Sequence, residues 1–134
     1  MNIERRREYK LPVLGPPISH YTDAVAWGDL MFVSGVVAVD KEMRLVGGDD
    51  VVLQTRQIFE NLKHILDAVG AGFGDIVKVT LFLTDIGDRT KINPVRQEYF
   101  GSARPASTLV QVSALAIPGA KLEIEAVAGL RARL

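Results

Sequence analysis

The sequence contains no cysteine, which excludes disulfide bonds and metal sites built on thiolates. It also lacks a net charge, because its 16 lysine and arginine residues are balanced by 16 aspartate and glutamate residues. Only Arg5, Arg6 and Arg7 form a basic cluster, and we interpret this triplet as a solvated edge. Without an extended positive field, the protein is not expected to bind nucleic acid.

Long hydrophobic runs are missing as well. The longest, residues 24–39, is interrupted by Gly28, Asp29 and Gly35, whereas a membrane-spanning helix needs about 20 consecutive apolar residues. The chain begins with charged side chains instead of an apolar signal segment. These absences predict a cytoplasmic protein with no membrane contact. The length predicts a single domain, residues 1–134, which buries about two thirds of the surface of its unfolded chain.

Strands are predicted in both halves of the chain. Residues 25–27 and 30–34 are expected to form an antiparallel hairpin, because the Gly-Asp turn between them supplies the positive φ that tight turns require. Residues 108–115 and 121–128 both alternate apolar and polar positions around a Pro-Gly pair. This pattern predicts a second hairpin.

Two helices and a strand are predicted between these hairpins. Apolar residues recur every three or four positions over residues 49–70, which predicts an amphipathic helix capped by one of two aspartates. Residues 76–83 are almost continuously apolar, as in a strand buried on both faces. The second helix has two possible starts. Asn93 and Pro94 could be its cap and first residue, or the proline could lie inside a helix that begins near Asp88.

Four stretches of the chain together resemble the RidA (YjgF-like) family of imine and enamine deaminases. They are residues 24–35, 54–62, 77–85 and 123–128, they occur in family order, and the resemblance extends over roughly residues 18–130. It implies a chorismate-mutase-like α+β fold, which agrees with the predicted order β-β-α-β-α-β-β and with two helices packed on one face of a mixed sheet. It also implies a homotrimer with active sites in the clefts between subunits. The apolar face that the helices leave uncovered would then be buried by neighbouring copies.

The resemblance implies catalytic roles for Glu123 and Tyr21. Glu123 matches the carboxylate thought to position or activate water, and Tyr21 matches a tyrosine that lines the cleft. Each residue also has an ordinary explanation. Tyr21 could be a hairpin tyrosine that packs its ring and leaves its hydroxyl in water. Glu123 shares a strand face with Lys121 and Glu125, and on a solvated face the three would form a simple polar stripe. On a cleft wall, the two carboxylates would raise one pKa, which suits proton transfer.

Four more residues are candidates for binding the substrate. Ser34 matches a cleft serine of the family, and Gly35 would let a ligand approach the backbone closely. Asn93 matches a cleft asparagine, although an asparagine before proline is also a natural helix cap. His20 is this chain's own feature. It could act as an acid or base near neutral pH, or be an idle residue of an exposed loop.

Ser107 stands where archetypal members of the family have an arginine that holds the substrate's carboxylate in a bidentate pair. Together with Leu109, the serine leaves a wider and more apolar wall, which suggests a larger or less charged substrate. Arg104 or Arg96 could supply a relocated cation, although regular strand alternation would place Arg104 on the opposite face from Ser107. Among arginine-lacking members, the 2-aminomuconate deaminases are the nearest named group.

Hydrolysis of an imine needs few catalytic groups, because the C=N carbon is already electrophilic and a positioned water with a carboxylate suffices. We therefore expect no cofactor and no metal. The resemblance predicts a hydrolytic deaminase of a small imine or enamine, and the absent arginine favours a 2-aminomuconate-type product of aromatic ring cleavage over 2-aminoacrylate. The alternative is a non-catalytic trimer that binds small metabolites or partner proteins in the same clefts.

Overall fold

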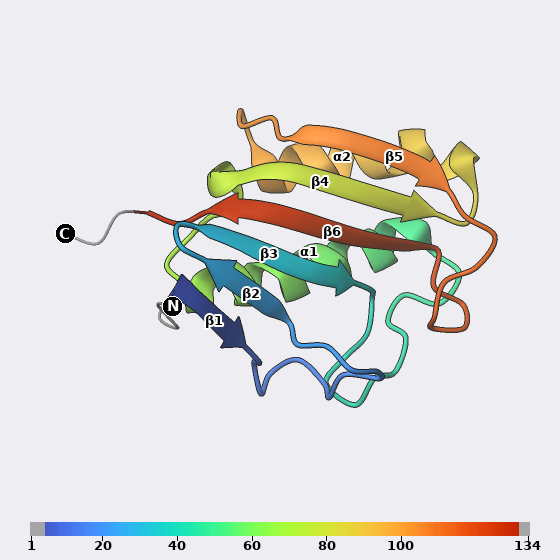
Figure 1. The fold of residues 1–134 in the computed structure, drawn as a ribbon. Helices are drawn as coiled ribbons and strands as arrows, with labels where there is room; N and C mark the ends of the chain where they lie inside the picture. The colour runs from blue at the N-terminus through green and yellow to red at the C-terminus, as the bar shows by residue number, and fades with distance from the viewer. Residues whose placement is uncertain (1–4, 132–134) are drawn as a thin grey trace.

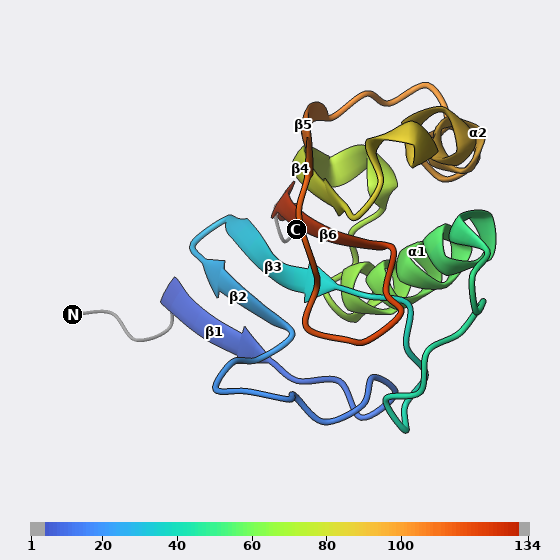
Figure 2. The ribbon, with the colours of Figure 1, turned by 90° about the vertical axis from the view of Figure 1, so that its right-hand side faces the viewer.

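The computed structural model describes residues 5–131. Six strands form one mixed sheet, and two helices pack on one of its faces (Figures 1 and 2). This arrangement confirms the predicted α+β class. The strands are β1 (Arg6–Tyr9), β2 (Ala24–Trp27), β3 (Leu30–Val36), β4 (Ile76–Leu83), β5 (Ala106–Gln111) and β6 (Leu122–Gly129), and the helices are α1 (Val51–Ala68) and α2 (Arg89–Phe100). Their order in the sheet is β1-β2-β3-β6-β4-β5.

The first predicted hairpin and the first predicted helix are confirmed. Strands β2 and β3 pair antiparallel, and Gly28 between them has a φ of 62°. Asp50 caps α1, because its side chain accepts hydrogen bonds from the backbone N–H groups of Val52 and Leu53. Buried residues of α1, led by Phe59, pack against the sheet and against the aromatic rings of α2.

Strand β1 was not predicted, because its four residues carry little apolar alternation. It contains Arg6 and Arg7 of the basic triplet and pairs with β2 at the edge of the sheet. Arg6 is exposed, in agreement with the interpretation of this segment as a solvated edge. Charged residues on an edge strand also discourage pairing with a further strand.

The predicted second hairpin is wrong. Strand β5 pairs with β4 in parallel, whereas β6 lies between β3 and β4 and is antiparallel to both. Strand β5 also ends at Gln111, before the predicted limit at Leu115. Alternation identifies a strand but not its partner. The parallel pair β4–β5 is joined by α2, as parallel neighbours require a crossover.

Strand β4 is buried on one face only, so the expectation of burial on both faces is wrong for the single chain. Val79, Leu81 and Leu83 contact the helices, whereas Val77 is 53% exposed on the uncovered face. Phe32 of β3 is 49% exposed on that face. The sheet therefore presents an open apolar surface. The almost continuously apolar sequence of β4 indicates that another protein surface should cover this face.

Helix α2 begins at Arg89, which selects the earlier of the two predicted starts. Pro94 lies inside the helix, and Asn93 is a helical residue rather than its cap. The buried side chain of Asp88 precedes the helix and pairs with Lys91 at 3.4 Å. Because Asn93 has no capping role, its amide is available for other contacts.

Candidate functional site

Glu123 lies across the backbone of Gly35. Strands β3 and β6 change register between Val33 and Val36, and this irregularity brings Gly35 beneath the glutamate. A Cβ atom built on Gly35 would lie 2.7 Å from Cδ of Glu123 and 3.0 Å from its Cγ. The first distance is shorter than Cβ contacts in proteins, and the second is tighter than most of them. The glycine is therefore what permits the carboxylate to lie in this position.

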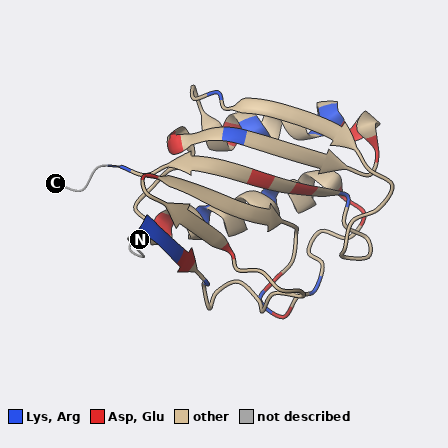
Figure 3. Ribbon diagram, viewed as in Figure 1, with Lys and Arg blue, Asp and Glu red and all other residues tan. Residues whose placement is uncertain are grey.

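The environment of Glu123 suits proton transfer. Partial burial raises the pKa of the Glu123 carboxyl, and the negative charge of Glu125 raises it further. Figure 3 shows acidic positions close together on β6. These are Glu123 and Glu125, and both belong to the open face of the sheet. A carboxyl whose pKa moves toward neutrality can both accept and return a proton. The role of Glu123 on a cleft wall stays a prediction.

A pocket beside this carboxylate, which we call the β3 pocket, contains three of the predicted residues. It is lined by Leu14, Gly15, Pro16, Pro17, Tyr21, Asp23, Ser34, Gly35, Val36, Val37, Val39, Met43, Asn61 and Ile65. The Ser34 hydroxyl donates a 2.6 Å hydrogen bond to the carbonyl of Thr22, so its proton has a structural role. The Tyr21 hydroxyl accepts a long 3.5 Å hydrogen bond from the Ile18 N–H.

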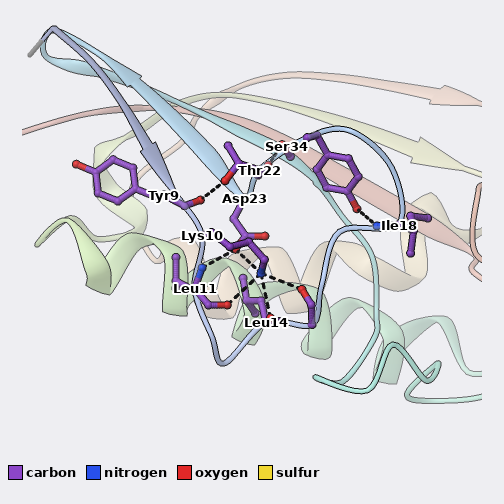
Figure 4. A network of polar contacts seen from close by, with 10 residues as sticks. Tyr9, Lys10, Leu11, Leu14, Ile18, Thr22, Asp23 and Ser34 are labelled. Carbon is purple, nitrogen blue, oxygen red and sulfur yellow. Dashed lines mark hydrogen bonds and ion pairs between the residues drawn. The ribbon is translucent and has the colours of Figure 1, made fainter. Parts of the chain in front are cut away.

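Lys10 organises the loop that forms one wall of the β3 pocket (Figure 4). Its ammonium donates to the carbonyls of Leu11, Leu14 and Gly15 at 2.9–3.1 Å and pairs with Asp23 at 3.0 Å. The Asp23 carboxylate also accepts the N–H of Leu11 at 2.8 Å. The sequence analysis missed this network, because an isolated lysine and aspartate thirteen residues apart show no recognisable pattern.

His20 lies in the same loop, but the structure does not bring it into the β3 pocket. Its side chain is exposed, and it is not among the residues that line the pocket. Within residues 5–131, no hydrogen bond or ion pair fixes its imidazole. The described protomer therefore gives no support for a role of His20 as an acid or base.

Ser107 and Leu109 lie in a different part of the molecule. Ser107 is opposite Val79 and Leu109 is opposite Leu81, which places both side chains on the helix face of the sheet. Glu123 is opposite Phe82 and belongs to the open face. Strand β4 also separates β5 from β6. One chain therefore does not bring Ser107 and Glu123 together in one pocket.

Arg96 occupies the space beside Ser107. Its Nη2 donates a 3.0 Å hydrogen bond to the Ser107 hydroxyl, and partial burial lowers the pKa of its guanidinium. A second pocket, which we call the α2 pocket, is lined by Asn93, Arg96, Gln97, Phe100, Gly101, Ala103, Arg104 and Pro105. Strand β5 begins only at Ala106, so the alternation argument does not apply to Arg104. Asn93, Arg96 and Arg104 thus share one pocket.

Neither pocket has the composition of a metal centre. In residues 5–131, no group of three or more histidine, cysteine, aspartate or glutamate side chains is arranged to hold a metal ion. In the same described part of the chain, no helix is both long and apolar enough to cross a membrane.

Residues 14–130 match the family model described as Endoribonuclease L-PSP. The chain belongs to this family. The family includes proteins named RidA and RutC, so it is the family that the sequence motifs indicated. The assignment to the 2-aminomuconate deaminases within the family stays a prediction.

Several relatives carry informative names. The 3-aminoacrylate deaminase RutC of Acinetobacter baylyi is 38% identical over 113 residues, which cover 84% of this chain and 89% of that protein. Reactive Intermediate Deaminase A, chloroplastic, of Arabidopsis thaliana is 37% identical over 117 residues, which cover 87% and 60% of the two chains. The crystal structure of E. coli TdcF with bound serine has a TM-score of 0.84 at 33% identity and covers 93% of this chain and 99% of that one. These names support a deaminase activity at the level of the family, and the structural likeness confirms the fold.

Proposed function

We propose that this protein is a hydrolytic deaminase of an imine or enamine metabolite, with Glu123 as its catalytic acid and base. The observation that carries the proposal is the Glu123 carboxylate held across Gly35, partly buried and with a raised pKa, beside the β3 pocket. Tyr21 and Ser34 on the wall of that pocket would orient the substrate. The domain that performs this reaction would comprise the whole chain, residues 1–134.

The reaction needs one water and one transferable proton. Glu123 accepts a proton from a water molecule as the water oxygen adds to the carbon of the protonated imine, and the product is a neutral carbinolamine. The protonated carboxyl then returns this proton to the nitrogen. Ammonia leaves as the C–N bond breaks, the hydroxyl proton passes to the Glu123 carboxylate, and a carbonyl remains. An enamine must first gain a proton on carbon, for which the Glu123 carboxyl or the Tyr21 hydroxyl is the donor.

The complete site would be formed between copies of the chain. The β3 pocket adjoins β3, whereas the α2 pocket is formed by α2 and the loop that precedes β5. Strands β6 and β4 separate β3 from β5, which puts β3 and β5 roughly 14 Å apart at the usual strand spacing. Their key side chains also face opposite sides of the sheet. A homotrimer, as the family resemblance implies, would place the β3 pocket of one copy against the α2 pocket of the next. The open apolar face around Phe32 and Val77 would supply the contact area.

The proposed substrate is a cytoplasmic 2-aminomuconate-type product of aromatic ring cleavage rather than 2-aminoacrylate. Ser107 and Leu109 form a wider and more apolar wall than the arginine-bearing wall of archetypal members. Arg96 fills the space directly beside Ser107, so a longer carbon chain would extend along Leu109. The size of the substrate, rather than the chemistry of the C=N bond, would then distinguish this protein from those relatives.

Ammonia release tests the proposal. The purified protein is incubated with enamines that include 2-aminomuconate and 2-aminoacrylate, each generated in place by a partner enzyme, and ammonia is measured against buffer. We expect release with the wild-type protein and its loss in Glu123→Gln. Glu125→Gln is the matched control: it should keep ammonia release, because the proton acceptor remains and burial, the larger cause of the raised Glu123 pKa, is unchanged. Binding of these compounds without ammonia from any of them would instead favour a non-catalytic binding module.

A further inference from the structure

In the described part of the chain, Arg96 is a positively charged side chain that is partly withdrawn from water and has no carboxylate partner. A guanidinium stays protonated at any physiological pH, and removing it from water is unfavourable unless an anion compensates. Its recorded hydrogen bond goes to the neutral hydroxyl of Ser107. Within residues 5–131, no carboxylate lies within 4.0 Å of it, whereas Arg56 pairs with Glu98. Binding of an anionic ligand at Arg96 would therefore compensate this charge.

The α2 pocket around Arg96 contains further groups that suit an anion. Arg104 and the amide of Asn93 line it, and its lining includes no aspartate or glutamate. The Ser107 hydroxyl accepts a hydrogen bond from Nη2 and so restrains the guanidinium. The other N–H groups of Arg96 remain for a ligand, and their fork geometry matches the two oxygens of a carboxylate. Arg104 is more exposed than Arg96, so water weakens its contribution.

We propose that Arg96, positioned by Ser107, binds the carboxylate of the substrate in the α2 pocket. The inference rests on the proposed function and adds the residue of this chain that would hold a substrate carboxylate. Archetypal members supply the guanidinium from position 107 on β5, whereas this chain would supply it from Arg96 on α2. The serine at position 107 therefore does not remove the positive charge from the site. Among the two relocated cations considered from the sequence, the structure favours Arg96 over Arg104.

Binding of a stable carboxylate tests this without relying on turnover. The full-length protein is titrated with 2-oxobutanoate, with its uncharged methyl ester and with inorganic phosphate, and the Kd values are measured by calorimetry. We expect the ester to bind at least tenfold more weakly than 2-oxobutanoate. Arg96→Met should weaken 2-oxobutanoate binding at least tenfold, and Arg96→Lys should not restore it, because an ammonium cannot form the bidentate pair.

Two further variants separate this site from a general effect of charge. Arg89→Met removes an exposed arginine at the start of α2 and should change the Kd less than twofold. Ser107→Ala keeps the guanidinium but removes its hydrogen bond, and it should weaken binding by about threefold, as loss of a modest hydrogen bond does. In the wild-type protein, 2-oxobutanoate should also shift the Nε–H resonance that disappears in Arg96→Met.

Unchanged 2-oxobutanoate affinity in a folded Arg96→Met protein would overturn the inference. A loss that appears in Arg104→Met but not in Arg96→Met would overturn it as well, as would tighter binding of phosphate than of the carboxylate. The outcome is distinct from that of the deaminase proposal. Arg96-dependent binding without ammonia release would leave this site standing and reject the deaminase, whereas ammonia release unaffected by Arg96→Met would do the reverse.

Discussion

Gly35→Ala is the sharpest test of the carboxylate geometry, because it alters the position of Glu123 without changing its chemistry. The φ of Gly35 is not in the left-handed region, so alanine can adopt the same backbone. The added Cβ would nevertheless lie 2.7 Å from Cδ of Glu123. Ordinary contact begins near 3.4 Å, so the carboxyl carbon must retreat by about 0.7 Å, and the nearer carboxylate oxygen must retreat further.

This displacement predicts a large effect on catalysis and a small effect on stability. A misplacement of about 1 Å in a reacting group costs roughly 100-fold in rate, so we expect kcat to fall about 10- to 100-fold. The carboxyl is the end of a flexible side chain, and forcing it off its preferred rotamer costs about 0.5–1.5 kcal/mol. Replacement of glycine by alanine stabilises by about 0.4–1 kcal/mol through the unfolded chain. The two effects nearly cancel.

The assay combines ammonia release with thermal melting. Gly74→Ala is the matched control, because a Cβ at Gly74 would meet only the Cβ of Ala103 at 4.0 Å. We expect the control to keep the wild-type kcat and Gly35→Ala to lose it, with both melting temperatures within a few degrees of the wild type. Wild-type turnover in Gly35→Ala would refute the reasoning, because it would show that the reaction tolerates a displaced Glu123 or does not use it.

The pKa of Glu123 is raised in the folded protein, so its carboxyl stays protonated to a higher pH in the folded protein than in the unfolded chain. The free energy of unfolding therefore falls as the pH rises from about 4.5 through the raised pKa. Glu123→Gln cannot ionise and should therefore melt above the wild type at pH 7 but not at pH 4; equal melting temperatures at both pH values would contradict this. Lys10→Met should lower the free energy of unfolding by only about 1 kcal/mol, since the Lys10 side chain is 36% exposed. It should raise KM with a smaller change in kcat, because the pocket wall loosens, and Lys10→Arg should restore much of the loss. Sedimentation should give a trimer at micromolar concentration, and a monomer would reject the shared site.

The sequence predicted those elements that are specified by a pattern among a few neighbouring residues. The three-four spacing in α1 and the Gly28 turn belong to this group, because periodicity and positive φ are properties of a few neighbouring residues. The pairing of β5 was beyond the same reasoning. Its alternation is compatible with either β4 or β6 as a neighbour, and the choice depends on the path of α2 across the sheet.

The candidate site was predicted in its residue types but not in its layout. Motif positions identified Glu123, Ser34 and Gly35, and the structure brings these together at the irregular register of β3 and β6. That irregularity has no sequence signal apart from the glycine itself. The separation of Ser107 from Glu123 by a strand and by a face was likewise invisible, since a motif records sequence order and not the side of a sheet.

The contact between Arg96 and Ser107 shows why the residue at position 107 alone does not determine which substrate the site accepts. A guanidinium spans several ångströms, so an arginine on α2 can place its charge beside a short side chain on β5. A serine at that position leaves the space into which Arg96 extends, whereas an arginine there would bring two like charges into contact. The two positions are therefore coupled: Ser107→Arg should reduce 2-oxobutanoate binding, and the double substitution Ser107→Arg with Arg96→Ser should recover it. Equal losses in the single and double variants would show that the two side chains act independently.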